Sequence, residues 1–344
     1  MTSQWSFISH ITNYLSKPKL GEQKAPTLWP SSATAIKDNT ILGKCRRQAF
    51  FRYAYDSYLY SEEYDSYKKF YKHIKENKLP VSNYSQWIFK QGQLYEDYCV
   101  DLAKESGVFI AGQTSVYIPP FNVSGKIDLV VINPETSKYH IVEVKSVYGF
   151  NANSVLGTDA QHKKGFMGEP RESHLMQLGI YQWWYGNASD DFDYALLVYG
   201  SRDTGRYGEY KLTVEEAEDG LEYIFYQGCA PITTSKVNSG ISIKSIMENY
   251  KRILNALENR VIPPRDYDLL YSQDKIKHMY ESGQLGKVDT AQYEKRKKQI
   301  EEGKSRVVKP VEKGDWQCRL CEYKNICYNS DSTEKDLIGL LSNE

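Results

Sequence analysis

The sequence predicts an α/β fold in which a central mixed sheet is flanked by helices, and the order of its segments leads to this prediction. A stretch with apolar residues at helical spacing is followed by segments rich in Val, Ile and Tyr, separated by the turn residues Pro119–Pro120 and Asn133–Pro134. A second helical stretch and two more strands come next. In chain order, the expected helix, three strands, helix and two strands are residues 84–106, 113–121, 122–133, 138–149, 171–185, 194–201 and 209–214. This order is typical of a small α/β core.

Helical additions are expected before and after this core. The segment from Cys45 to about Ile74 is rich in aromatic and charged residues and lacks Gly and Pro, which indicates one or two helices. Residues 149–170 are rich in Gly, Asn and Lys and are expected to form a loop. We therefore divide the chain into an N-terminal helical region, a core, a second helical region and a cysteine-bearing tail, at residues 1–83, 84–215, 216–315 and 316–344.

The composition is that of a globular protein, with 40% hydrophobic and 26% charged residues. No apolar run approaches the ~18 residues that span a bilayer, and the first ten residues lack the pattern of a secretory signal. We therefore expect an intracellular protein without a membrane partner. Lys plus Arg and Asp plus Glu both total 44. This balance argues against a protein that coats nucleic acid through global positive charge, but it permits a local basic groove beside an acidic metal site.

Two short strings on neighbouring expected strands carry the chemistry. The first, at residues 125–128, reads Gly-Lys-Ile-Asp, and the second, at residues 143–145, reads Glu-Val-Lys. Side chains alternate along a strand, so Glu143 and Lys145 share one face, and an antiparallel neighbour can place Asp128 beside Glu143. Two adjacent carboxylates repel each other unless a cation neutralises them, and oxygen ligands suit Mg²⁺ or Mn²⁺.

This pattern resembles the PD-(D/E)XK nucleases, and its G-x-x-D form is similar to the RecB-like branch of that superfamily. The resemblance implies a restriction-endonuclease-like core in which Asp128, Glu143 and Lys145 are catalytic. It also implies that the Val144 carbonyl joins the carboxylates as a metal ligand. The proline of the family name is missing, because Ile127 precedes the aspartate. An isolated E-x-K is also common on solvated strands, so the resemblance depends on further motifs.

Two helical motifs flank these strands in the order typical of the family. On the first helix, Gly92 and Glu96 form a G-x-x-x-E pattern, which implies Glu96 as a further metal ligand, with its neighbour Asp97 as an alternative. On the second helix, Gln177 and Tyr181 are four residues apart and therefore lie on one face. This Q-x-x-x-Y pair resembles the RecB-family signature, which implies that both side chains belong to the catalytic site. Each motif alone is also typical of an ordinary amphipathic helix.

The tail contains three cysteines in a C-x2-C-x5-C arrangement, Cys318, Cys321 and Cys327. Three thiolates leave a tetrahedral centre one ligand short, and Cys45 is the natural fourth. The set resembles a group of RecB-like nucleases, including AddB-type nuclease domains and CRISPR-associated exonucleases. That resemblance implies a [4Fe–4S] cluster that tethers the C-terminal tail to the N-terminal region. Four thiolates also suit a structural Zn²⁺ ion, and the spacing alone does not distinguish the two metals.

The resemblances together imply a Mg²⁺- or Mn²⁺-dependent DNA nuclease that hydrolyses phosphodiester bonds, as an exonuclease on single-stranded DNA or on DNA ends. The sequence has no P-loop motif, so any unwinding is expected from a separate helicase or recombination protein. A catalytically silent DNA-binding or scaffold subunit and a zinc-stabilised protein that acts on RNA are the alternatives. The basic side chains expected at DNA lie near the first cysteine and after the acidic site: Lys44, Arg46, Arg47, Lys163 and Lys164.

Overall fold

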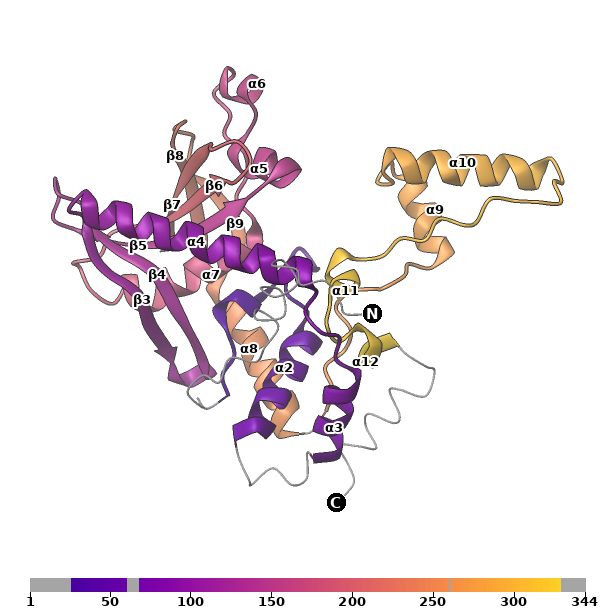
Figure 1. Cartoon of the computed structure of the whole chain (residues 1–344), viewed down its shortest axis with the longest axis horizontal. Coiled ribbons are helices and arrows are strands. Elements are labelled where there is room, and N and C mark those ends of the chain that lie inside the picture. The colour runs from indigo at the N-terminus through magenta and orange to yellow at the C-terminus, as the bar shows by residue number, and fades with distance from the viewer. Residues whose placement is uncertain (1–25, 61–67, 260, 329–344) are drawn as a thin grey trace, which may run out of the picture.

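The computed structural model describes residues 26–60, 68–259 and 261–328, and its centre is a seven-stranded sheet (Figure 1). The strands lie side by side in chain order, and every neighbouring pair is antiparallel except β5 and β6, which are parallel. The expected α/β class with a mixed central sheet is confirmed. The strands are β3 (Phe109–Ile118), β4 (Val123–Ile132), β5 (Tyr139–Val147), β6 (Ala195–Ser201), β7 (Tyr207–Glu216), β8 (Glu222–Ala230) and β9 (Val237–Ser242).

Helices cover both faces of this sheet. The long helix α4 (Asn83–Glu105) crosses one face (Figure 1), and α7 (Glu172–Tyr181) lies on the opposite face, where it continues into a π-helical turn. Alternate residues of β5 point to opposite faces, so Val142 and Val144 pack under α4 while Glu143 points toward α7. The two helices expected to carry functional residues therefore approach the sheet from its two sides.

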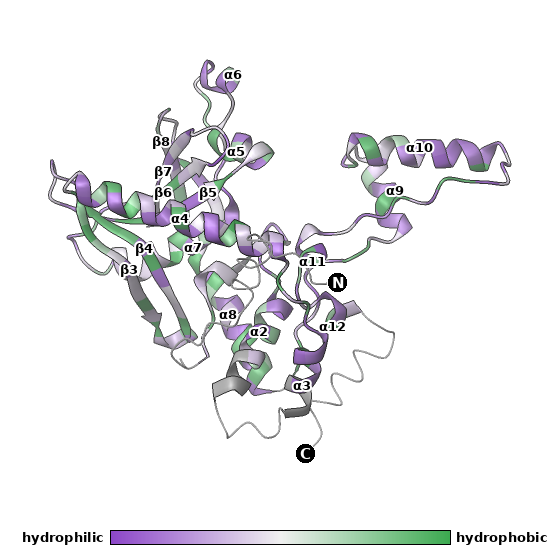
Figure 2. Ribbon diagram, in the orientation of Figure 1, coloured by the Kyte–Doolittle hydropathy of each residue, from purple (hydrophilic) through white to green (hydrophobic). Residues whose placement is uncertain are grey.

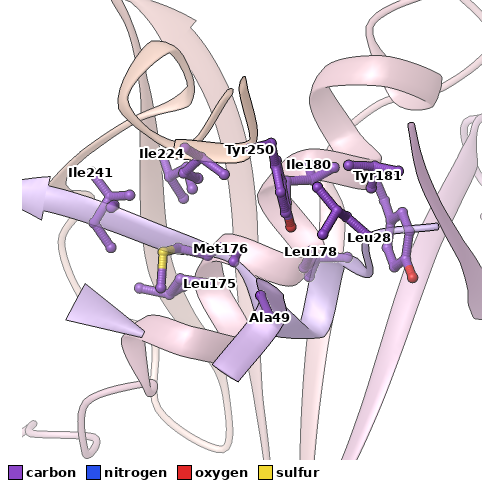
Figure 3. Packing of buried hydrophobic residues seen from close by; sticks show 14 of the residues in the cluster. Leu28, Ala49, Leu175, Met176, Leu178, Ile180, Tyr181, Ile224, Ile241 and Tyr250 are labelled. Atoms are coloured by element: carbon purple, nitrogen blue, oxygen red, sulfur yellow. The ribbon is translucent and has the colours of Figure 1, made fainter. Parts of the chain in front are cut away.

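The position of α7 is fixed by the largest hydrophobic cluster of the described residues. Figure 3 shows side chains of this helix packed among Leu28, Ile224 and Tyr250. Gly179 lies directly against Ile224, and a Cβ at this position would overlap that side chain. The helix is therefore held rigidly, which favours a precise placement of its polar side chains. Its buried hydrophobic residues are Leu175, Met176, Leu178, Ile180 and Tyr181.

The N-terminal region contains a hairpin that the sequence analysis did not predict. Strands β1 (Thr34–Lys37) and β2 (Thr40–Gly43) are joined by Asp38 and Asn39, whose φ angles are 48° and 60°. Positive φ at both central positions is the type I′ geometry of tight hairpins, which Asp and Asn tolerate better than most residues. The hairpin leads directly to Cys45, so it helps to position the first cysteine of the expected metal centre.

Two expectations about the flanking regions differ from the structure. Residues 149–170, expected to be a loop, contain the short helices α5 (Gly149–Leu156) and α6 (Asp159–His162). Residues 216–315, expected to be mainly helical, begin with β8 and β9 and become helical only from α8 (Ile243–Glu258). The sheet therefore extends to residue 242, well beyond the expected end of the core at residue 215.

The helical additions lie beside the sheet and beyond it. Helices α2 (Arg46–Tyr60), α3 (Lys68–Asn77) and α8 form a group next to the sheet (Figure 1), as expected for the segment after Cys45. Helices α9 (Gln273–Glu281) and α10 (Lys287–Glu301) project away from the rest as an arm. Figure 2 shows that α10 is mainly hydrophilic.

The arm returns to its starting point before the cysteine-bearing tail. The backbone N–H of Tyr271 donates to the carbonyl of Lys313, and that of Asp315 donates to the carbonyl of Asp268, both at 2.7 Å. The tail then forms α11 (Trp316–Arg319) and α12 (Lys324–Tyr328). Residues 1–25 of the expected N-terminal region and residues 329–344 of the expected tail lie outside the described residues. Over the described ranges, we find no helix with the length and apolar character that crossing a membrane requires.

Candidate active site

The acidic residues lie where two strands of the sheet separate. The pairing of β4 with β5 ends at Leu129, which lies opposite Val142. The next positions in the same register are Asp128 and Glu143, so the two carboxylates stand side by side at the fork between the strands. On the other side of β4, the β3–β4 register skips the position of Asp128 opposite Gln113, whose φ is 51°. The backbone at Asp128 is therefore released from regular pairing on both sides.

Both carboxylates are buried and only partly satisfied. Asp128 is 9% exposed and Glu143 is 1% exposed. The backbone N–H of Val144 donates to Oδ2 of Asp128 at 2.9 Å. Oε1 of Glu143 accepts hydrogen bonds from Nζ of Lys145 and from Nε2 of Gln177. Oε2 of Glu143 is buried and has no hydrogen-bond partner among the described residues, which leaves this oxygen for a cation.

Burial and charge repulsion make the metal-free pair of carboxylates unfavourable. Burial raises the pKa of Glu143 to about 8, the charge of Lys145 opposes this increase, and the charge of Asp128 adds to it. Burial also raises the pKa of Asp128, against the charge of Lys145 and the hydrogen bond from Val144. Burial lowers the pKa of Lys145, but the charges of Glu143 and Asp128 outweigh this effect and leave the pKa raised. A divalent cation would relieve the remaining repulsion.

Glu96 reaches the same site from α4. Burial, helped by the charge of Asp128, raises the pKa of Glu96 to about 7. A cleft of about 660 Å³ opens between α4 and the strands, and its lining includes Glu96, Lys126 and Lys145. Asp97, the alternative to Glu96, also lines this cleft but is exposed. The influence of Asp128 on Glu96 favours Glu96 as the third acidic group of the site.

The Q-x-x-x-Y motif on α7 contacts both strand motifs. Nε2 of Gln177 donates a 2.7 Å hydrogen bond to Oε1 of Glu143, and Gln177 also hydrogen-bonds with the hydroxyl of Tyr181. That hydroxyl donates in turn to the carbonyl of Lys126 at 3.0 Å. A Cβ at Gly125 would overlap the Tyr181 hydroxyl, so the glycine of G-x-x-D is required by the tyrosine of Q-x-x-x-Y. The structure thus brings together all six side chains predicted to be catalytic.

A second cleft of about 700 Å³ continues from the first. The two clefts share Lys126, and the second is also lined by Trp29, Tyr117 and Tyr181. The guanidinium of Arg52 lies over the Trp29 ring, 3.1 Å from its centroid. The acidic residues therefore lie between two hollows, of which the second combines aromatic rings with a nearby positive charge.

The oxygen donors at the fork fit a hard divalent cation. Carboxylate oxygens are preferred by Mg²⁺ and Mn²⁺, and Glu143 offers a buried oxygen that none of the described residues satisfies. Val144, whose carbonyl is a predicted ligand, lines the first cleft. Among the residues that the structure describes, no group of three or more His, Cys, Asp or Glu side chains is arranged to hold a metal ion as it stands. Asp128 and Glu143 are adjacent, so they would supply the first two ligands.

The four cysteines of the predicted cluster line one narrow cavity, although Cys45 is far from the others in sequence. Cys45 immediately precedes α2, Cys318 lies in α11, and Cys327 lies in α12. Burial raises the pKa of Cys321 and of Cys327 to about 12, so the metal-free thiols hold their protons firmly. Four thiols are the donor types of a shared metal centre, because a bound metal would replace those protons and remove the cost of burying thiolates. In the described residues, however, they are not arranged to hold a metal ion as they stand.

Two of the five residues expected at DNA are engaged within the protein. Nε of Arg46 donates to Asp266 at 2.9 Å, and the two side chains form an ion pair. Arg47 is 2% exposed, and its Nε donates to the carbonyl of Pro263 at 2.6 Å. These guanidinium groups tie the start of α2 to the segment at residues 263–266 beside the cysteine cavity. A direct role at DNA does not fit Arg46 or Arg47, because their donors are already used.

The other three expected basic residues differ in their surroundings. Lys163 and Lys164 follow α6 and are exposed, so they can reach a phosphate. Lys44 is half-buried, and its ammonium lies 5.9 Å from the centroid of the Trp316 ring. Burial lowers the pKa of Lys44, and the nearby Cys321 opposes this effect. Lys44 therefore lies beside the cysteine cavity, and only the two lysines after α6 lie openly on the surface.

Sequence reasoning missed a buried tyrosine next to the predicted catalytic lysine in the sheet. Tyr199 is fully buried on β6, directly opposite Lys145 in the parallel register. Its hydroxyl lies 2.9 Å from Nδ1 of His174 and accepts a 3.1 Å hydrogen bond from the backbone N–H of Arg171. Burial lowers the pKa of His174 well below its ordinary value, so the imidazole is neutral. The sequence could have pointed to Tyr199, because it places a hydroxyl group within the largely apolar expected strand at residues 194–201.

No protein-family model matches this chain, and neither the curated proteins nor the solved structures contain a match to it. The interpretation of the site therefore rests on its geometry and on the motifs that form it.

Proposed function

We propose that this protein is a metal-dependent DNA nuclease of the PD-(D/E)XK type, with its active site at the fork between β4 and β5. The observation that carries the proposal is the adjacency of two buried carboxylates, Asp128 and Glu143, with Lys145 bonded to one of them. Nothing about folding requires this pair, because burying two acids together raises their pKa and destabilises the protein. Such a cost is typical of a functional site.

The reaction class follows from the ligands. Mg²⁺ or Mn²⁺ held by Asp128, Glu143 and Glu96 would polarise a phosphoryl oxygen and activate the attacking water. Lys145 carries a fixed positive charge beside the carboxylates, where it would stabilise the negative charge that develops on the phosphate. Gln177 would hold Glu143 in the orientation that keeps Oε2 free. These roles together describe hydrolysis of a phosphodiester.

The substrate class rests on the resemblance and on the two clefts. An open cleft on either side of the acidic residues offers a path for a chain that continues past the cleavage site. The cysteine cavity would hold a structural [4Fe–4S] cluster that connects the start of α2 with α11 and α12. We propose single-stranded DNA or DNA ends as the substrate, with exonuclease action.

A cleavage assay with controlled metal content tests the proposal. End-labelled single-stranded and duplex DNA of one sequence would be incubated with the purified protein and Mn²⁺, Mg²⁺, Ca²⁺ or EDTA. The expected result is cleavage with Mn²⁺ and Mg²⁺, preference for single strands or ends, and no products in EDTA. A protein that binds these DNAs but yields no products with either metal would instead be a silent DNA-binding subunit.

The variant Lys145→Ala separates chemistry from binding in the same assay. Its expected effect is loss of cleavage with retained DNA binding, because the lysine stabilises developing charge at the fork. Lys138→Ala is the matched control, since Lys138 directly precedes β5 and its ammonium donates to the carbonyl of Asp190, away from the carboxylates of the fork. Equal loss of cleavage in both variants would argue against a specific role for Lys145.

A further inference from the structure

Four exposed aromatic side chains lie on α4 and at the junction of β5 and α5, and one of them, Phe89, lines the first cleft. Tyr84 and Phe89 on α4 are 64% and 65% exposed, and Tyr148 and Phe150, where β5 passes into α5, are 41% and 84% exposed. Large apolar side chains that gather on a surface are typical of an interaction site. We call these four residues the aromatic rim.

Side-chain contacts connect the two segments of the aromatic rim through Tyr84 and Tyr148, and link them to a third part of the chain at Arg202. The hydroxyl groups of Tyr84 and Tyr148 are 2.8 Å apart, which joins α4 to the end of β5. Arg202, just after β6, places its guanidinium 4.8 Å from the centroid of the Tyr148 ring and donates from Nη1 to Gln91 on α4. Nε of Arg202 is buried and has no hydrogen-bond partner among the described residues. A positively charged group thus lies against the Tyr148 ring.

The aromatic rim is continuous with the proposed active site. Phe89 lines the first cleft together with Glu96 and Lys145. Tyr148 is three residues beyond Lys145, which also lines the cleft, so this ring lies near the cleft.

We propose that the aromatic rim is a subsite that stacks the bases of an unpaired DNA strand while the adjacent phosphate lies in the cleft. This inference rests on the proposed function and deepens it by naming the residues that select unpaired bases. Aromatic rings with a nearby arginine bind single strands because every base has a flat face that can stack, whereas a duplex hides those faces. The charge of Arg202 and the continuity with an acidic, metal-fitting cleft favour a phosphate-bearing strand over an apolar protein segment.

A binding measurement tests the proposal without needing cleavage. It uses the full-length protein with the metal centre of its four cysteines intact. The double variant Tyr84→Ala/Phe89→Ala would be titrated, with EDTA present to prevent cleavage, against a fluorescent oligodeoxynucleotide, its duplex, and a strand of the same length whose sugars carry no bases. Loss of two stacking contacts is expected to weaken binding of the normal strand at least about tenfold. Binding of the base-free strand and of the duplex is expected to change less than about twofold.

Two control variants keep the result interpretable. Tyr98→Ala removes an aromatic side chain of the same helix that is 58% exposed but does not belong to the aromatic rim, so its binding is expected to match the native protein. Tyr84→Phe/Phe89→Tyr keeps both rings and is expected to keep the affinity. Unchanged binding of the normal strand by the alanine variant, or an equal loss on the base-free strand, would overturn the stacking subsite. Neither outcome would contradict the proposed nuclease activity, because the cleavage assay tests that activity separately.

Discussion

Gln177 on α7 donates a 2.7 Å hydrogen bond to Oε1 of Glu143 on β5, and the other oxygen of that carboxylate has no hydrogen-bond partner in the part of the chain that the structure describes. The amide thus fixes the rotation of a buried acid and aims its free oxygen into the fork beside Asp128. Because α7 is anchored by the main hydrophobic cluster, this geometry is part of the fold (Figure 3). Removing this hydrogen bond should therefore have a measurable effect on the site.

Replacing Gln177 by Ala is expected to weaken the use of metal without unfolding the protein. Loss of a hydrogen bond that orients a metal ligand costs about 10- to 100-fold in metal affinity or activity. The measurement is the Mn²⁺ concentration that gives half-maximal cleavage. Gln284→Ala, at an exposed position between α9 and α10, is the control. An unchanged Mn²⁺ requirement in Gln177→Ala would show that Glu143 does not depend on this amide.

Gly125→Ala is expected to lower stability because its new Cβ would overlap the hydroxyl of Tyr181. Inserting an atom into a packed site costs about 1–3 kcal/mol. The free energy of unfolding in denaturant is the measurement, and Tyr181→Phe in the same chain should recover part of the loss by removing the overlapping oxygen. A neutral Gly125→Ala would mean that the two motifs are not in contact.

The pH dependence of stability should reveal the buried acid pair. The pKa of Glu143 is about 8 in the folded protein, against an ordinary value of 4.5, so the folded state holds this proton more tightly than the unfolded chain. Its contribution is therefore most favourable at low pH and is lost as pH rises from about 4.5 to about 8. Glu143→Gln removes the titration, and its stability relative to the native protein should rise by on the order of a few kcal/mol across this range.

Thermal unfolding of both proteins between pH 5 and pH 8.5, in buffer without added divalent cations, measures this difference. Adding Mn²⁺ at pH 8 should stabilise the native protein, because a cation that binds only the folded state shifts the unfolding equilibrium, and should leave Glu143→Gln nearly unchanged. A stability difference that does not vary with pH would contradict the burial of an uncompensated carboxylate at the fork.

Replacing Cys321 by Ser is expected to destabilise the fold rather than to alter cleavage chemistry. The four cysteines join the start of α2 to α11 and α12, so losing the centre frees both segments. Metal analysis and visible absorption of the native protein should give about four iron atoms per chain and a brown chromophore. Cys229→Ser, outside the cavity, is the control and should retain the metal. One zinc atom per chain and no colour would show that the centre holds zinc and not an iron–sulfur cluster.

The parts of this protein that the sequence predicted well depend on local patterns. Strands at residues 122–133 and 138–149 and the long helix after residue 83 were predicted because their apolar periodicity is strong. Pairing those strands as a hairpin places Asp128 beside Glu143 almost without further information, which is why the acidic pair was found. The cysteine set was likewise found because three of its members share one short segment of chain.

The parts that the sequence did not predict depend on long-range packing. Strand β9 carries Asn, Ser and Gly, which are poor strand formers, and is held in the sheet by β8. Arg46 and Arg47 read as a basic patch, but distant partners at residues 263–266 bury them. Tyr199 could not be linked to Lys145 because the parallel partner of β5 lies about fifty residues further along the chain.

The most direct test of the account is the initial rate at which the protein and its Asp128→Asn variant cleave labelled single-stranded DNA at saturating Mn²⁺. Asparagine keeps the size of the side chain but removes the charge that would hold the cation, so the rate should fall at least about a hundredfold while the protein stays folded. A variant that cleaves DNA within about twofold of the native rate would contradict a metal-dependent active site at the β4–β5 fork.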